Sequence, residues 1–350
     1  MRVMPNSRKV AIFSDIHLGV HMNSPAWHEV SQNWAKWYVA DLQDKNIEEV
    51  IFCGDFFHNR NEITVNTLHQ AGELLDLFKD LKIYMIAGNH DSFYKNNCSV
   101  NSIRIFSGRK NIEVIDKPTS IQFFGKECFF APWGTAVETI PESDVIFGHF
   151  EIESFKMNSY KICDHGFKSG DLLGKASLIV SGHFHHREER KYSKGTILYV
   201  GSPFELDFGD EGTTKGYYIL DFNDLTYQFY ENTLSPRHIK INLSDLIKIK
   251  DFHNKGKEVF GNNIVKLVVD KTISANDLDR LSTKIGTLKP HSYVIDNAIN
   301  FDLFGAANQE EIDLSGVDIP RAINEFINLL DIQNKQDITE YTISLYNHCK

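Results

Sequence analysis

Five short segments of the chain carry residue types that bind metal ions or transfer protons, and each follows an apolar run. They read Asp15-Ile16-His17, Gly54-Asp55, Gly88-Asn89-His90-Asp91, Gly148-His149 and Gly182-His183-Phe184-His185. A glycine precedes most of them, as expected where a strand ends in a sharp turn. Residues two apart in a strand point to the same face, so Asp15 should converge with His17, and His183 with His185.

Carboxylate oxygens, an amide oxygen and imidazole nitrogens together suit Mn²⁺, Fe²⁺ or Zn²⁺. None of the five motifs contains a cysteine, which argues against a structural zinc site. Seven ligands are too many for one ion, but they suit two ions that share a carboxylate. Two ions about 3.5–4 Å apart can stabilise both the attacking and the leaving oxygen of a phosphoryl group. One such motif alone is more often structural, but five in series predict a two-metal site. The expected ligands are Asp15, His17, Asp55, Asn89, His149, His183 and His185.

The elements around these motifs predict an α/β fold. Strands are expected at 9–17, 48–55 and 82–91, with helices between them at 24–45 and 64–81. This alternation implies parallel strands joined by helical crossovers. From about residue 112 the apolar runs are mostly strand-like, with few long helices between them. The pattern predicts two sheets packed face to face, with helices outside.

Two further parts follow this sandwich. A β-α-β unit after residue 236 has a helix that begins with a capping box at Ser274 and Asp277. Two amphipathic helices end the chain, with apolar stripes at Ile323, Phe326, Ile327 and Leu330 and at Ile338, Tyr341, Thr342 and Leu345. We therefore expect a core domain at 1–235, a small α+β domain at 236–308 and a helix pair at 309–350.

Composition limits the function classes. The chain has 350 residues and a net charge of −10, which argues mildly against nonspecific nucleic-acid binding over the whole surface. No apolar run is long enough for a membrane span, and the basic N-terminus lacks the apolar stretch of a signal peptide. The five cysteines form no CxxC pair, which is typical of free thiols in a reducing compartment. We expect a cytoplasmic protein.

The motif series resembles that of the calcineurin-like metallophosphoesterase superfamily over roughly residues 9–220. The resemblance implies the two-sheet metallophosphoesterase sandwich. It also implies two ligand sets with Asp55 as the bridge: Asp15, His17, Asp55 and His185 for the first ion, and Asp55, Asn89, His149 and His183 for the second.

The residues after Asp55 narrow the resemblance. Protein phosphatases of the superfamily read GDxVDRG and usually GNHE at the corresponding motifs, whereas this chain reads GDFFHNR and GNHD. It is similar there to SbcD-type DNA nucleases, and especially to the nuclease subunit of tailed-phage recombination endonucleases. That branch implies that His58 faces the substrate phosphate without binding metal, although His58 could instead cap the following turn. In the mechanism that follows, His90 would stabilise the charged phosphorane or protonate the leaving sugar oxygen, and Asp91 would orient His90.

The resemblance implies a Mn²⁺-dependent DNA exonuclease or endonuclease that acts in recombination, repair or replication-linked end processing, in the host cytoplasm if a phage encodes it. An SMC-like ATPase would dock on the C-terminal helices, within a complex that contains a homodimer of this chain, and the domain at 236–308 would cap the DNA. The capping domain is small and the chain is acidic, and both features weaken the prediction of how DNA is held. Candidate phosphate contacts are Arg60, Lys95, Arg187 and Arg190.

Two other functions remain open from the sequence. The chain could be a phosphatase or small-molecule phosphodiesterase, which would turn over a model phosphomonoester better than DNA. It could also be a non-catalytic scaffold of a DNA repair complex, although every motif keeps its ligands. The terminal helices could equally fold back on the core.

Overall fold

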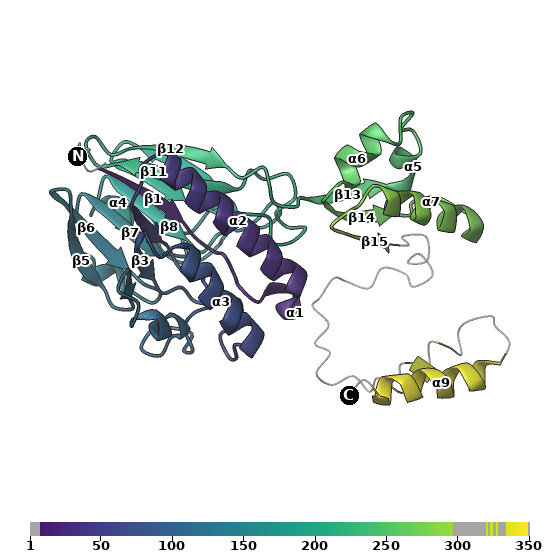
Figure 1. Ribbon diagram of the computed structural model, residues 1–350. Helices are drawn as coiled ribbons and strands as arrows, with labels where there is room; N and C mark the ends of the chain where they lie inside the picture. Colours follow the sequence, from purple (N-terminus) through teal and green to yellow (C-terminus); the bar gives the residue numbers. More distant parts are fainter. Residues whose placement is uncertain (1–7, 297–319, 321–322, 325–326, 328–333, 349–350) are drawn as a thin grey trace. The chain divides into compact units, whose positions relative to one another are not determined.

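The computed structural model describes residues 8–296, 320, 323–324, 327 and 334–348 (Figure 1). The chain divides into two compact units, Met1–Ala298 and Ile299–Lys350. Within the described residues, no helix is both long and apolar enough to cross a lipid bilayer.

The first sheet of the larger unit holds the predicted parallel strands. Its order is β12-β11-β1-β2-β3-β4, in which β1 to β4 run parallel and β11 and β12 are antiparallel additions at one edge. Helices α2 (Pro25–Asp44) and α3 (Val65–Leu77) supply the first two crossovers. The strands are β1 (Lys9–Phe13), β2 (Glu49–Phe52), β3 (Lys82–Ile86), β4 (Ile112–Ile115), β11 (Gly216–Asp221) and β12 (Thr226–Glu231).

The second sheet has the order β5-β6-β7-β8-β10-β9, with a parallel centre and an antiparallel strand at each edge. The two-sheet α/β sandwich predicted from the sequence is therefore confirmed. The strands are β5 (Thr119–Phe123), β6 (Lys126–Ala131), β7 (Val145–His149), β8 (Leu178–Gly182), β9 (Glu188–Tyr192) and β10 (Gly195–Tyr199).

Two short elements of this sheet were not predicted. Strand β9 begins with four charged residues, so it has no apolar run to reveal it, and charge of this kind is typical of an edge strand. Helix α4 (Ser169–Leu173) is too short to show a helical period, although it places Leu172 and Leu173 against the outer face of the sheet.

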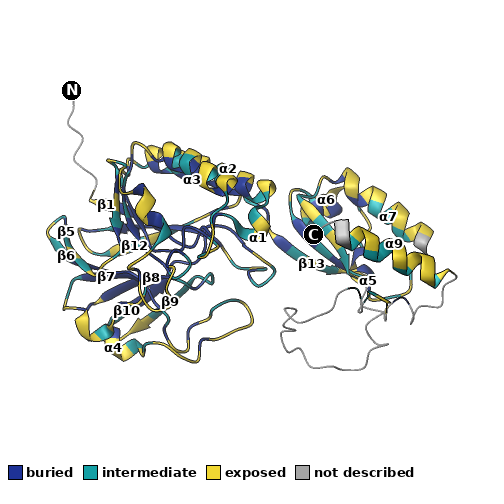
Figure 2. Ribbon diagram, turned by 90° about the horizontal axis from the view of Figure 1, so that it is seen from below, coloured by how far each residue is buried: buried dark blue, intermediate teal, exposed yellow. Residues whose placement is uncertain are grey.

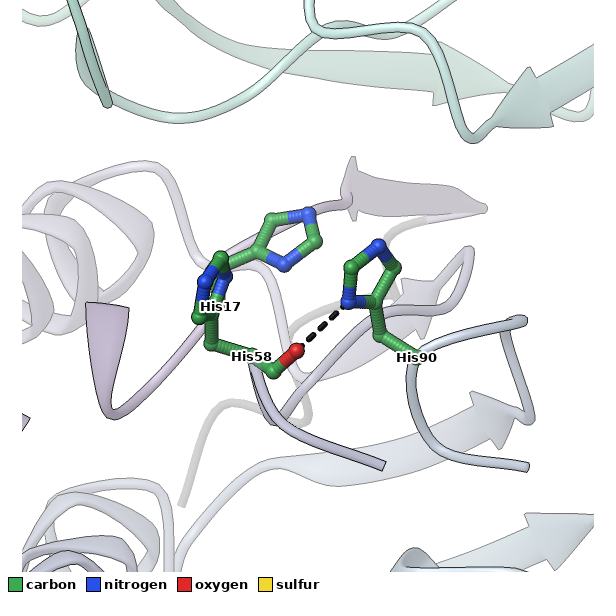
Figure 3. A group of neighbouring side chains, drawn as sticks. All are labelled: His17, His58 and His90. Carbon is green, nitrogen blue, oxygen red and sulfur yellow. Dashed lines mark hydrogen bonds between the residues drawn. The ribbon is translucent and has the colours of Figure 1, made fainter. Parts of the chain in front are cut away.

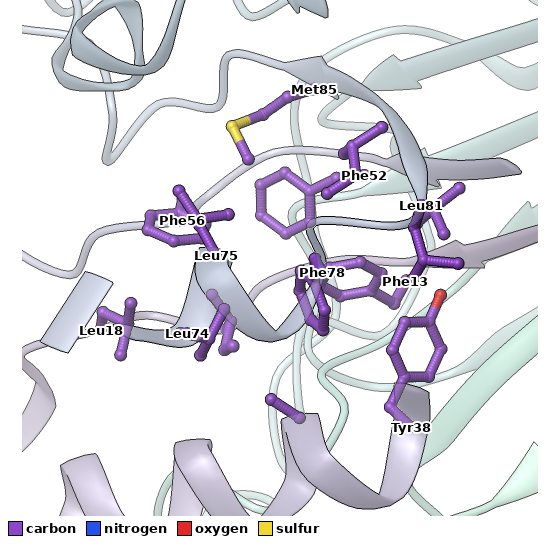
Figure 4. Close-up of a cluster of buried hydrophobic side chains, with 14 of the residues drawn as sticks. Phe13, Leu18, Tyr38, Phe52, Phe56, Leu74, Leu75, Phe78, Leu81 and Met85 are labelled. Atoms are coloured by element: carbon purple, nitrogen blue, oxygen red, sulfur yellow. The ribbon is translucent and has the colours of Figure 1, made fainter. Parts of the chain in front are cut away.

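The alternation of side chains along β1 divides the core into layers. Val10 and Ile12 face the second sheet, while Ala11 and Phe13 face α2 and α3. The strands are buried between outer helices whose far faces are exposed (Figure 2). The Phe13 ring lies 4.9–6.1 Å, centroid to centroid, from four aromatic rings: Trp34, Tyr38, Phe52 and Phe78. Figure 4 shows Phe13 with Tyr38, Phe52 and Phe78. This aromatic layer anchors the strand that leads to the first motif.

A third, parallel sheet in the order β13-β14-β15 follows, with a hydrophobic core of its own. It confirms the predicted β-α-β elements and adds β13 and two short helices. In α7 the Ser274 hydroxyl accepts a hydrogen bond from Asp277 N at 3.1 Å, which is one half of the predicted capping box, and it donates to the Asp277 carboxylate at 2.7 Å. The elements are β13 (His238–Asn242), α5 (Leu243–Leu246), α6 (Asn254–Phe260), β14 (Ile264–Val268), α7 (Ala275–Thr287) and β15 (Ser292–Asp296).

The smaller unit contains α9 (Lys335–His348), whose apolar residues Ile338, Tyr341 and Leu345 are exposed. Of the preceding predicted stripe, Phe326 and Leu330 lie outside the described residues, while Ile327 is buried.

We expect Phe13→Ala to lower the free energy of unfolding by about 3–5 kcal/mol, because it empties the centre of the aromatic layer. Urea denaturation followed by circular dichroism measures this loss. Phe93→Ala is the matched control, because Phe93 is 53% exposed, and it should change stability by less than about 0.5 kcal/mol. Equal effects of the two substitutions would contradict the packing described above.

Candidate metal centre

All five motifs meet at one edge of the sandwich, where the carboxyl ends of β1, β2 and β3 in the first sheet face those of β7 and β8 in the second. Clefts at the carboxyl ends of parallel strands are the usual ligand sites of open α/β sheets. Strand β1 ends at Phe13, two residues before Asp15, and β8 ends at Gly182. The ligands therefore lie in turns that follow the strands, except for His149, which is the last residue of β7.

The ligand side chains do not converge through strand alternation, as the sequence analysis expected. Asp15, His17, Asp55 and His183 have φ angles of 57°, 46°, 61° and 89°, in the left-handed region that side-chain-bearing residues rarely adopt. Strand alternation therefore does not aim them. His183 and His185 were expected to point at one spot, yet they join different groups. Conformations of this kind cost on the order of 1–3 kcal/mol each and cluster at functional sites.

The first group brings together Asp15, His17 and His185, whose ligand atoms lie within 4.8 Å of one another. His17 Nε2 is 3.0 Å from His185 Nε2. Asp15 and His17 are almost completely buried. Ligand atoms bound at about 2.1 Å to one ion lie roughly 3 Å apart, so this spacing fits a shared cation.

The second group contains Asp55, His149 and His183, again within 4.8 Å. His149 Nε2 and His183 Nδ1 each lie 2.8 Å from the side-chain oxygen of Asn89. The outer nitrogen of His149 is 2.7 Å from the Cys53 carbonyl, to which it donates a hydrogen bond. Nε2 of His149 is therefore the nitrogen that faces the group and would bind a metal ion.

Asp55 lies between the two groups. Its Oδ2 is 3.6 Å from His17 Nε2 and 3.3 Å from His149 Nε2, while its Oδ1 accepts a hydrogen bond from His90 N at 2.8 Å. One oxygen thus faces both groups, which is the arrangement that a bridging carboxylate needs. Gly88 permits it, because a Cβ there would lie 2.2 Å from Asp55 Oδ1.

The electrostatics of the groups suit cations. Burial raises the pKa of Asp15 to about 7, and the nearby Asp55 charge adds to this effect. Burial lowers the pKa of His185 to about 4, so its imidazole is neutral and its lone pairs are available near pH 7. Burial opposes protonation of His149, yet the Asp55 charge raises its pKa to about 9. His149 is therefore protonated near pH 7 in the metal-free protein and must release that proton to bind an ion. Two buried carboxylates and imidazoles without a thiol form a donor set that fits divalent ions such as Mn²⁺.

His58 and His90 form a third group with His17 beside the first (Figure 3). The His90 and His58 rings stack with centroids 5.6 Å apart, and His90 Nδ1 lies 2.5 Å from the His58 carbonyl oxygen. That bond leaves His90 Nε2 free of the protein backbone. The turn after His58 is capped by Asn59, whose side-chain oxygen accepts from Asn61 N at 2.9 Å. The capping alternative for His58 therefore has no support.

Asp91 does not orient His90, and the prediction of that role is wrong. Its carboxylate accepts four backbone hydrogen bonds of 2.9–3.0 Å, whereas the His90 ring is held by the His58 carbonyl. The side chain of Asp91 is buried beneath the loops, so it cannot reach the ring of its neighbour. The four donors are the N–H groups of Asp55, Phe56, Phe57 and Gly88.

Two of the four predicted phosphate contacts are engaged by the protein. The Arg187 guanidinium donates to the Tyr218 hydroxyl at 3.0 Å and lies over the Phe229 ring. The Arg190 guanidinium donates to Glu188 at 2.7 Å and lies over Phe155. Each contact uses only some of the five guanidinium N–H donors, so phosphate binding by Arg187 and Arg190 stays a prediction. Lys95 is exposed and Arg60 partly so, and both stay predictions.

Glu151 and Trp133 touch the second group and were missed from the sequence. Glu151 Oε1 lies 3.2 Å from His183 Nε2, and the Trp133 ring centroid is 5.2 Å from that of His183. Both residues line a pocket of about 210 Å³ beside His149. The only signal for Glu151 was its position two residues after a ligand, which is too common a pattern to be specific.

Residues 9–224 match the Calcineurin-like phosphoesterase superfamily domain, which is well over half of the chain. The protein belongs to this superfamily. Calcineurin-like phosphoesterases use divalent metal ions, and the Asp and His groups described above could bind them.

Relatives of this superfamily member include components of nucleases. It is 28% identical to Exonuclease subunit 1 of Enterobacteria phage T4, over 97% of this chain and 98% of the relative. It is 22% identical to the SbcD component of the SbcCD nuclease of Staphylococcus epidermidis, over 62% of this chain and 66% of the relative. A solved structure of an archaeal phosphodiesterase matches 64% of this chain and 99% of its own, with 15% identity and a TM-score of 0.37.

We expect the substitution Asp91→Ala to lower the free energy of unfolding. It leaves four buried N–H groups without an acceptor, and because each such group costs about 1–3 kcal/mol, we expect a loss above about 3 kcal/mol. Chemical denaturation of the metal-free protein measures it. The control is Asp80→Ala, at an exposed position, which should leave stability unchanged. A stable Asp91→Ala protein that lost only activity would place Asp91 in the chemistry instead.

Proposed function

We propose that this phosphoesterase is the nuclease subunit of a DNA-processing complex and hydrolyses DNA phosphodiester bonds with two divalent ions, most favourably Mn²⁺. The observation that carries the proposal is the position of Asp55 Oδ2 between two groups of metal-type ligands. DNA is favoured over other phosphoesters because the chain is similar along nearly its whole length to a phage exonuclease subunit. The function would serve DNA recombination, repair or replication-linked end processing.

The proposed ligand sets are the two described groups, each completed by a shared or adjacent residue. Asp15, His17, His185 and Asp55 would hold the first ion, and Asn89, His149, His183 and Asp55 the second. When bound, such ions activate a water molecule and neutralise the charge of the phosphoryl group.

His90 has the geometry of a proton donor. Its Nδ1–H donates to the His58 carbonyl, so the second proton of the imidazolium would sit on Nε2, away from the backbone. From there it can protonate the departing sugar oxygen or stabilise charge on the phosphate. The His58 ring, stacked on His90, would face the same phosphate. Lys95 and Arg60 are the proposed contacts to flanking phosphates.

The partner proposal follows from the relatives, whose names describe them as subunits. We propose that an SMC-like ATPase binds the helix pair at 309–350, that 236–308 caps the DNA on the core at 1–235, and that two copies of the chain join in the complex. The exposed residues Ile338, Tyr341 and Leu345 of α9 support docking, since a helix bound in a groove anchors through one apolar stripe.

A metal-dependent assay tests the function directly. The protein is incubated with Mn²⁺ on linear duplex DNA, on single-stranded circular DNA and on p-nitrophenyl phosphate, with and without the co-expressed ATPase. Cleavage of DNA that a chelator abolishes is the expected result. Faster turnover of the phosphomonoester than of DNA would favour a phosphatase, and no turnover by the metal-loaded protein would favour a scaffold.

His90→Asn should keep both ions and DNA binding but lose most cleavage, about 10²–10⁴-fold, because general-acid help is lost in the transition state. Rates are measured on the metal-loaded protein, with metal content checked by elemental analysis. His69→Asn, on the exposed face of α3, is the control. Cleavage within a few-fold of wild type would exclude His90 as the proton donor.

Ending the chain after Gly316 should leave a folded, metal-binding protein, because the larger unit, Met1–Ala298, contains its own cores. It should act on short DNA yet no longer copurify with the ATPase. A large drop in melting temperature would support helices that fold back on the core. A complex that survives the truncation would rule out docking on these helices.

A further inference from the structure

His183 is held on both sides of its ring. Its Nδ1 lies 2.8 Å from the Asn89 side-chain oxygen, on the side of the second group, and its Nε2 lies 3.2 Å from Glu151 Oε1. A neutral imidazole carries one proton, and the partner of one nitrogen decides which nitrogen keeps a lone pair. The Asn89 oxygen and the Glu151 carboxylate are both acceptors, but the charged carboxylate is the stronger one. The proton therefore belongs on Nε2, which leaves the lone pair on Nδ1.

The backbone presents Glu151 to this ring rigidly. Phe167 N donates to the Glu151 carbonyl at 2.8 Å, and Glu153 N donates to the Phe167 carbonyl at 2.9 Å. Gly166 makes this close approach possible, since its φ is +91° and a Cβ would lie 2.3 Å from the Glu151 oxygen. The segments around Ile152 and Phe167 thus form a parallel β-bridge next to the residue that contacts His183.

The surroundings of the ring favour a persistent contact. Trp133 lies against His183 with ring planes inclined by 32°, and the Glu151 side chain is only 29% exposed. Two other histidines of the groups, His149 and His17, have no carboxylate on the outer nitrogen. His149 donates to the Cys53 carbonyl, and the buried Nδ1 of His17 has no hydrogen-bond partner among the described residues.

We propose that Glu151 is a positioning residue of the second metal site: it accepts a hydrogen bond from His183 Nε2–H and thereby fixes Nδ1 as the atom that binds the ion. The inference rests on the proposed two-metal function. A charged partner also makes the imidazole a stronger ligand, and removing such a partner typically lowers metal affinity about 10–100-fold. Because Glu151 touches only His183 among the proposed ligands, the effect should be confined to one of the two ions.

The test measures the binding of Mn²⁺ to the full chain. Calorimetry and the electron paramagnetic resonance signal of free Mn²⁺ give the affinity of each site. Glu151→Ala should weaken one of the two sites about 10–100-fold and leave the other within about twofold. Glu151→Gln keeps an oxygen acceptor and should restore part of the loss. The control is Glu153→Gln, an exposed glutamate on the same segment, which should bind both ions as the wild type does.

A second readout reports the tautomer itself. Long-range ¹H–¹⁵N spectra of the metal-free protein should show His183 protonated at Nε2 in the wild type and in Glu151→Gln. A mixture of tautomers is expected in Glu151→Ala. Thermal melting of the metal-free variants separates this effect from a general loss of structure, and Glu151→Gln carries the test if the alanine variant does not fold.

Unchanged affinity at both sites in Glu151→Ala, or equal weakening of both, would overturn the inference. Two ions bound by the wild type without DNA cleavage would overturn the proposed function and leave the role of Glu151 standing. A wild-type protein that binds fewer than two ions would refute both.

Discussion

The buried carboxylate of Asp91 is the constraint on which the rest of the site depends. It gathers four backbone N–H groups from the loops after β2 and β3, and so it fixes the path of the chain on both sides of Asp55. Asp55 in turn adopts a left-handed conformation that an unsupported aspartate would rarely hold. Without this hub, Asp55 would not lie between His17 and His149, and the two groups would have no common ligand.

The second sheet supplies the remaining ligands of the site. His149 and His183 come from the ends of β7 and β8, and they reach Asn89 and Asp55 from across the sandwich. Gly182 allows this contact, because a Cβ there would lie 2.0 Å from Ser14 Oγ. The packing of the two sheets is thus part of the site chemistry. A shift of one sheet against the other would separate Asp55 from His149 and His183, and it would also move His185, which follows β8, away from His17.

The sequence predicted the fold class and the residues that meet, because apolar runs that end in Gly-Asp or Gly-His mark strand ends in a parallel sheet. It could not predict how they meet, since left-handed turns and not strand alternation aim Asp15 and His183. Adjacency in sequence suggested that Asp91 supports His90, whereas burial turns its carboxylate toward the backbone. Likewise a lone arginine in sequence carries no sign that Phe229 and Tyr218 enclose it, as they do Arg187.

The central claim is that two ions share Asp55. The most direct measurement is the anomalous X-ray scattering of manganese in a crystal grown with Mn²⁺. The account predicts two peaks about 3.5–4 Å apart on either side of Asp55 Oδ2, one beside His17 and His185 and one beside His149 and His183. A single peak, or a peak enclosed by His17, His58 and His90, would contradict it.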